Sequence, residues 1–151
     1  MIRVLIDADA CPVKDEIYRV ALRHGVAVVV VSNQRLRTPD HPAITRAVVS
    51  DAFDAADDWI VQTASGDDVV VTGDILLADR CLKVGATVLA HTGRPFTTAS
   101  IGAAVATRAI MADLRAGIDS IGGPAPFAKT DRSRFLQALD EALVRLKRRT
   151  S

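Results

Sequence analysis

Short apolar runs recur along the chain and alternate with segments of helical character. Runs rich in Val, Ile and Leu that are bounded by Gly, Pro, Asp or Asn are typical of strands buried on both faces. In the third run the pattern is ambiguous, and Val48-Val49 favours a short strand. We predict five strands: Ile2–Ile6, Val26–Val31, one within Ala43–Ser50, Val69–Thr72 and Thr87–Ala90.

The segments between and after these runs carry apolar residues at helical spacing. Gly25, Gly85 and Gly117 follow three of these segments, and glycine commonly ends a helix. Two polar, Pro- or Gly-rich stretches, Gln34–Pro42 and Gly122–Pro126, are predicted to be loops. The predicted helices are Val13–His24, Asp54–Ala64, Ile75–Val84, Ser100–Ala116 and Asp131–Arg148.

Strands that alternate with helices predict an α/β fold with a mostly parallel, doubly wound five-stranded sheet. If the strand order is 3-2-1-4-5, Asp7 and Asp74 lie on neighbouring strands. Two additional C-terminal helices are predicted to follow the sheet. The 151 residues fit one domain, with a core of about residues 1–93 and a helical part of about 98–148. Ligands of such sheets bind beyond the carboxyl ends of the strands, where the strand order reverses.

Composition narrows the class of protein only in part. Aromatic residues make up 4% of the chain, so the core must be built mainly from aliphatic side chains. The two cysteines, Cys11 and Cys81, lie far apart and predict neither a disulfide framework nor a zinc site. The N-terminus turns acidic too early for a signal peptide, and no run approaches the ~20 apolar residues of a membrane span. We therefore expect a soluble, cytoplasmic protein with no membrane partner.

Three aspartates mark the predicted ligand-binding edge of the sheet. Asp7 ends the first predicted strand, Asp9 follows two residues later, and Asp74 ends the fourth. Carboxylates that converge from neighbouring strands suit Mg²⁺ or Mn²⁺, which are hard ions that prefer oxygen ligands. A metal bound there would neutralise charge on a reacting phosphate and activate water. Further carboxylates are reserve candidates for this site: Asp54, Asp57, Asp58 and Asp79.

Helix capping is the simpler explanation for several of these aspartates. Asp9, Asp54, Asp74 and Asp131 each precede a predicted helix, and Asp is a favoured N-cap residue. Capping does not explain Asp7, which lies at the end of an apolar strand.

Candidate substrate-binding residues lie in loops and at strand ends. We assign this role to Ser32, Asn33, Arg94 and Arg132. Arg35, Arg37 and Arg134 share the same setting and are suited to a phosphate backbone, although each alone is also consistent with ordinary solvated surface. Cys11, at a predicted helix start, is better explained as a small buried residue than as a nucleophile.

Six short motifs, in order over nearly the whole chain, resemble those of the YaiI/YqxD family of bacterial proteins. They are Asp7-Ala8-Asp9-Ala10-Cys11-Pro12, Ser32-Asn33-Gln34, Phe53-Asp54-Ala55-Ala56-Asp57, Thr72-Gly73-Asp74-Ile75, Gly122-Gly123-Pro124 and Asp131-Arg132. The resemblance implies a PIN-like three-layer α/β/α fold related to metal-dependent nucleases, with RNA as the expected partner. It further implies metal ligands at Asp7, Asp9 and Asp74, with a fourth at Asp57 or Asp54, where PIN nucleases usually carry a Glu.

Two other functions remain open at this point. A haloacid-dehalogenase-type phosphatase would use Asp7 as nucleophile and Asp9 as acid, but it needs a Lys, and none occurs between Lys14 and Lys83. A non-catalytic RNA-binding protein would need the basic loops and no metal.

Overall fold

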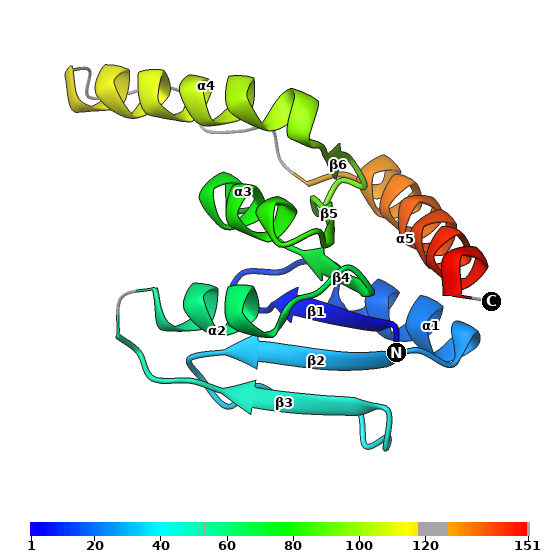
Figure 1. Ribbon diagram of the computed structural model, residues 1–151. Helices are drawn as coiled ribbons and strands as arrows, with labels where there is room; N and C mark the ends of the chain where they lie inside the picture. Colours follow the sequence, from blue (N-terminus) through cyan, green and yellow to red (C-terminus); the bar gives the residue numbers. More distant parts are fainter. Residues whose placement is uncertain (53, 118–126, 151) are drawn as a thin grey trace.

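A six-stranded sheet forms the centre of the fold, and Figure 1 shows its strands from β3 at the bottom to β6 at the top. The computed structural model describes residues 1–52, 54–117 and 127–150. Phe53, the predicted loop Gly122–Pro126 and the motif Gly122-Gly123-Pro124 lie outside the described residues. The strands are β1 (Arg3–Asp7), β2 (Ala27–Ser32), β3 (Ile44–Val48), β4 (Asp68–Val71), β5 (Thr87–Leu89) and β6 (Pro95–Phe96).

The strand order is β3-β2-β1-β4-β5-β6, so the condition under which Asp7 and Asp74 lie on neighbouring strands is met. These five pair in parallel, and the central strand β1 pairs with both β2 and β4. The prediction of five strands was wrong by one, because β6 adds an antiparallel edge strand beside β5. With only two residues, one of them Pro95, β6 is too short to appear as an apolar run, and Pro is tolerated at a sheet edge.

The helices are α1 (Lys14–His24), α2 (Ala55–Thr63), α3 (Ile75–Lys83), α4 (Thr98–Gly117) and α5 (Lys129–Thr150). All five predicted helices are present, with boundaries that differ by no more than a few residues. Gly25 ends α1 in the left-handed region at φ +68°, as its position predicted. Among the helices in the described ranges, none combines the length and the apolarity needed to cross a bilayer.

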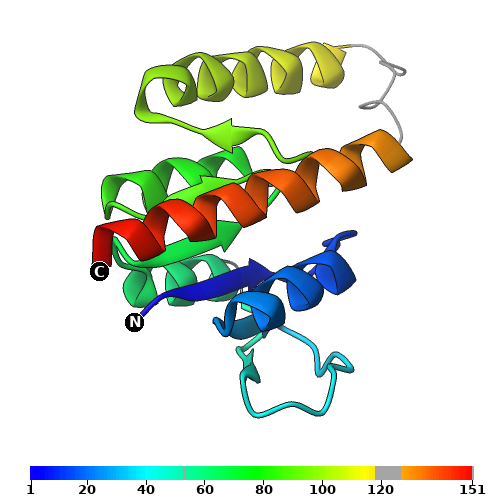
Figure 2. The same cartoon turned by 90° about the vertical axis from the view of Figure 1, so that its right-hand side faces the viewer.

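Helices cover both faces of the sheet, and each face has its own apolar core. On one face α1 and α5 pack over alternate strand residues such as Val4 and Ile6. On the other face Leu5 and its neighbours contact residues of α2, α3 and the beginning of α4. Figure 2 shows α5 running alongside α1, so the C-terminal helix returns to the first helix of the chain. The alternation of side chains along β1 therefore supplies both cores.

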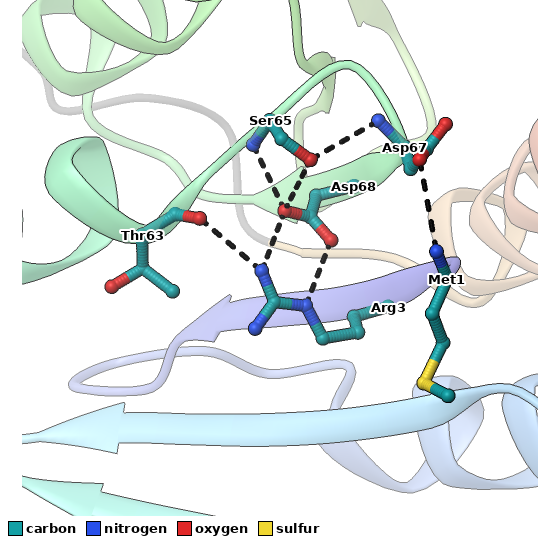
Figure 3. A network of polar contacts seen from close by, with 6 residues as sticks. All are labelled: Met1, Arg3, Thr63, Ser65, Asp67 and Asp68. Atoms are coloured by element: carbon teal, nitrogen blue, oxygen red, sulfur yellow. Dashed lines mark hydrogen bonds and ion pairs between the residues drawn. The ribbon is translucent and has the colours of Figure 1, made fainter.

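A charged network at the amino end of β1 joins it to the start of β4 (Figure 3). The Arg3 guanidinium donates two hydrogen bonds to the carboxylate of Asp68, at 3.0 and 2.9 Å, and a third to the Thr63 carbonyl. The backbone N–H and the hydroxyl of Ser65 also donate to Asp68, which is completely buried. Asp68 is the first residue of β4, one residue before the predicted strand, and this network satisfies its buried carboxylate.

We expect Asp68→Ala to destabilise the protein by about 3 kcal/mol, because it leaves the half-buried Arg3 guanidinium without its partner. Urea unfolding followed by circular dichroism measures the difference. The neighbouring Asp67→Ala is the matched control, expected to change stability by no more than about 0.5 kcal/mol. Equal effects of the two substitutions would contradict the role given to the Arg3–Asp68 pair.

Candidate acidic site

An acidic cavity of about 230 Å³ opens at the carboxyl ends of the central strands. Five of its lining residues are aspartates, contributed by β1, by the loops after β1 and β4, and by the beginning of α2. Among the described residues, no Lys, Arg or His lines it. The lining residues are Asp7, Asp9, Asn33, Ser50, Ala52, Asp54, Ala55, Ala56, Asp57 and Asp74.

The hydroxyl of Thr72 connects the two aspartates that the strand ends bring together. It donates a 2.7 Å hydrogen bond to Oδ2 of Asp7 and accepts a 3.0 Å bond from the backbone N–H of Asp74. Thr72 is completely buried, so both bonds are shielded from water. Thr72 therefore fixes the Asp7 carboxylate relative to the backbone that carries Asp74. One feature of the sequence could have indicated this role: Thr72 is a polar residue that directly follows the apolar run of β4.

Asp74 caps a helix in the structure, whereas Asp9 does not. The Asp74 carboxylate accepts from the N–H groups of Leu76 and Leu77, as an N-cap residue of α3 does. Asp9 instead lies in a turn ahead of α1 and accepts from the N–H of Asn33, at 3.3 Å. That bond joins the loops that follow β1 and β2 at the mouth of the cavity.

Two residues near the cavity have unusual backbone conformations. Ala10 and Asp54, with φ of +68° and +62°, are the non-glycine residues in the left-handed region within the described ranges. Asp54 occupies the N-cap position of α2 but makes no side-chain capping bond, so its predicted capping role was wrong. Such conformations are unfavourable by roughly 1–3 kcal/mol and are concentrated at functional sites in proteins.

The crowded carboxylates raise one another's affinity for protons. Burial, followed by the charges of Asp7, Asp74 and Asp54, raises the pKa of Asp57 to about 6. Burial also raises the pKa of Asp7, and the charges of Asp74 and Asp9 add to this effect, while the hydrogen bond from Thr72 opposes it. Asp57 and Asp7 therefore carry both the cost of burial and the repulsion of neighbouring carboxylates.

The structure separates the reserve carboxylates into two groups. Asp54 and Asp57 line the cavity, as described above. Asp58 forms an ion pair with Arg80 at 2.9 Å, and Asp79 pairs with Lys83 one helical turn further along α3. Neither Asp58 nor Asp79 lines the cavity, so the fourth candidate ligand is Asp57 or Asp54.

Of the four predicted substrate-binding residues, only Asn33 lines the acidic cavity. The Ser32 hydroxyl donates to the carbonyl of Gln34. Arg132 donates to the Pro12 carbonyl and to Glu16, which joins α5 to α1. Arg94 lines a separate cavity of about 540 Å³ with Thr92, Gly93, Asp131 and Arg134. The roles of Ser32, Arg94 and Arg132 in binding a substrate stay predictions.

Two more side chains near the site are held by packing. Cys11 is 6% exposed, and burial raises the pKa of its thiol to about 11, which agrees with a buried core residue rather than a nucleophile. The His91 ring packs against Gly73, where an added Cβ would lie 3.1 Å from its Cε1 atom. Because Gly73 has no side chain, His91 in the segment after β5 can pack against the backbone next to Asp74.

The chemistry of the lining side chains fits a hard divalent cation, because the candidate ligands are all carboxylates. In the part of the chain that the structure describes, no group of three or more His, Cys, Asp or Glu side chains is arranged to hold a metal ion. Mg²⁺ keeps several waters and is commonly bound by one or two carboxylates together with substrate phosphates. The cavity is therefore compatible with a water-rich site of that kind and not with a closed cage of protein ligands.

Comparison with known proteins finds a family match along most of the chain. The family model described as "Uncharacterized BCR, YaiI/YqxD family" matches residues 5–145. A "UPF0178 protein" of Sphingopyxis alaskensis is 71% identical over 146 residues, covering 96% of this chain and 95% of the relative. Proteins of the same description from Jannaschia sp. and Nitrobacter winogradskyi are 60% and 56% identical, each over at least 94% of both chains. No solved structure matches the chain.

The raised pKa of Asp57 predicts how the metal-free protein responds to pH. The stability that Asp57 contributes is greatest below its unfolded pKa of 3.8 and is lost as the pH rises through about 6. Asp57→Asn should therefore raise the melting temperature above about pH 7 and have a smaller effect near pH 4. Thermal unfolding in EDTA at both pH values measures this, with Asp15→Asn on the exposed side of α1 as control. An increase in melting temperature that is equal at both pH values would contradict the raised pKa of Asp57.

Proposed function

The chain belongs to the YaiI/YqxD family, and from its acidic site we propose that it is a divalent-metal-dependent phosphodiester hydrolase. The observation that carries this proposal is the cavity of five aspartates in which Thr72 holds Asp7 against the backbone of Asp74. Neither core packing nor helix capping requires five carboxylates around one cavity. A bound cation would relieve the repulsion that raises the pKa of Asp57 and Asp7.

In this proposal Asp7, Asp9, Asp57 and Asp74 hold Mg²⁺ or Mn²⁺, and Asp7, Asp9 and Asp74 are the catalytic set. When bound, the ion supplies charge neutralisation at the phosphate and lowers the pKa of a coordinated water. Thr72 restricts the Asp7 carboxylate to one orientation, and the bonds from Leu76 and Leu77 do the same for Asp74. Asn33 contributes a neutral side chain at the rim, suited to a phosphate oxygen.

The finer assignment within this class is a ribonuclease with a PIN-like fold. It is supported by the motif resemblance, and the sheet with helices on both faces is compatible with it. The phosphatase alternative needs a Lys near the nucleophile, and within the described residues no Lys lines the cavity. Trapping of an aspartyl-phosphate at Asp7 would favour that alternative over the hydrolysis of diesters.

We expect the protein to bind Mn²⁺ and to cleave single-stranded RNA only when Mn²⁺ or Mg²⁺ is present. Asp7→Asn should lower the cleavage rate at least about 100-fold, because it removes a metal ligand while preserving the shape of the side chain. Calorimetry and a gel-based cleavage assay measure the two properties, and Asp15→Asn is the control. Metal binding without cleavage would reduce the proposal to a metal-binding protein, and the absence of both would reject it.

Thr72→Val tests the positioning of Asp7 separately from metal ligation. The substitution keeps the buried shape and removes both hydrogen bonds of the hydroxyl, so Mn²⁺ affinity should fall about 10- to 100-fold. Thr72→Ser, which retains the hydroxyl, should restore most of the affinity in the same titration. If the Thr72→Val and Thr72→Ser variants bind Mn²⁺ equally well, Thr72 has only a packing role.

A further inference from the structure

We propose that a basic groove along the β3 edge of the sheet binds the phosphate backbone of a single-stranded nucleic acid and directs it to the acidic cavity. The groove has a volume of about 730 Å³ and lies between β3 and the 33–43 segment that leads into it. Its lining residues are Arg35, Arg37, Thr38, Pro39, Asp40, His41, Ile44, Thr45, Arg46 and Val48. The inference adds a binding surface for the substrate of the hydrolase proposed above and rests on that function.

The direction of the groove follows from the parallel pairing of β2 and β3. The connection between parallel strands must return from the carboxyl end of the first to the amino end of the second. Here no helix makes that return, and residues 33–43 run back along the sheet edge. In Figure 2 this connection is the cyan loop that extends away from the helices. The groove therefore runs lengthwise beside β3.

One end of the groove meets the acidic cavity. Asn33 lines the cavity, and Arg35, two residues later, lines the groove. On the other segment Val48 lines the groove and Ser50 lines the cavity. Residues two apart in sequence have Cα atoms no more than about 7 Å from each other. The two hollows thus adjoin along both chain segments at the carboxyl end of the sheet.

The charges of the two hollows are opposite. Arg35, Arg37 and Arg46 line the groove, and Asp40 is the acidic residue among the described residues that line it. Arg35 and Arg37 are exposed and form no ion pair with another described residue, so their guanidinium groups are available to a ligand. Arg46 donates to the Leu36 carbonyl at 3.1 Å, which fixes the loop against β3.

This distribution of charge fits a ligand with anionic groups repeated along its length. Arginines in the groove would hold phosphates on one side of the reacting group, while the carboxylates and their cation receive the reacting phosphate. The cavity of about 230 Å³ accommodates one phosphodiester and not a duplex, which favours a single strand. No Phe, Tyr or Trp side chain is among the described residues that line the groove, so contact with phosphates rather than base stacking should dominate.

The test is binding of a fluorescein-labelled oligouridylate in EDTA, where no hydrolysis occurs, followed by fluorescence anisotropy at several salt concentrations. We expect Arg35→Gln/Arg37→Gln to weaken binding at least about tenfold. Its slope of log affinity against log salt should be shallower by about 1.4 than that of the unmodified protein, because two phosphate contacts are lost. Arg19→Gln/Arg108→Gln removes the same charge from exposed sites on α1 and α4 and is the matched control.

The proposal is overturned if the groove variant binds as well as the control variant, or if polyglutamate competes as effectively as unlabelled oligouridylate. Circular dichroism and thermal unfolding establish that both variants are folded. Groove-dependent binding without metal-dependent cleavage would support the groove and reject the hydrolase. The opposite result would be cleavage of bis(p-nitrophenyl) phosphate that depends on Asp7, while Arg35 and Arg37 have no effect on oligouridylate binding. That result would support the hydrolase and reject the groove.

Discussion

The backbone hydrogen bonds that pair β1 in parallel with β2 on one side and β4 on the other fix the rest of this structure. They place the carboxyl ends of three strands at the same edge of the sheet. The register sets Asp7 beside Val31 and Ile6 beside Val71, so the polar residues that follow each strand face one another. At the opposite end, the half-buried Arg3 and the buried Asp68 join β1 to β4. A slip of one residue would exchange the faces on which all side chains of β1 lie.

The acidic cavity brings five carboxylates together, and no Lys, Arg or His is among the described residues that line it. The carboxylates are held by hydrogen bonds from Thr72 and from the beginning of α3, and these bonds orient the side chains without neutralising them. Burial and, after it, mutual repulsion raise the pKa of Asp57 and Asp7, and this opposes folding at neutral pH. In the proposed function, a divalent cation together with a phosphate would offset this concentration of charge.

The absence of a helix between β2 and β3 has a functional consequence in this proposal. A helical crossover would cover the edge of the sheet, whereas residues 33–43 leave a groove beside β3. The same segment begins at the acidic cavity with Asn33 and continues into the groove with Arg35. One connection can therefore serve both the chemistry and the binding of a charged chain.

The sequence by itself determined the alternation of strands and helices and the edge at which Asp7 and Asp74 meet, because buried parallel strands leave continuous apolar runs. The order of the strands came from the tertiary structure. Only the tertiary structure decided which polar residues accompany these two aspartates. Thr72 and Ser50 joined the site, Asp58 and Asp79 formed ion pairs outside it, and Arg132 attached α5 to α1. Side-chain direction at a strand end depends on packing between distant segments, and that packing has no periodic signature in the sequence.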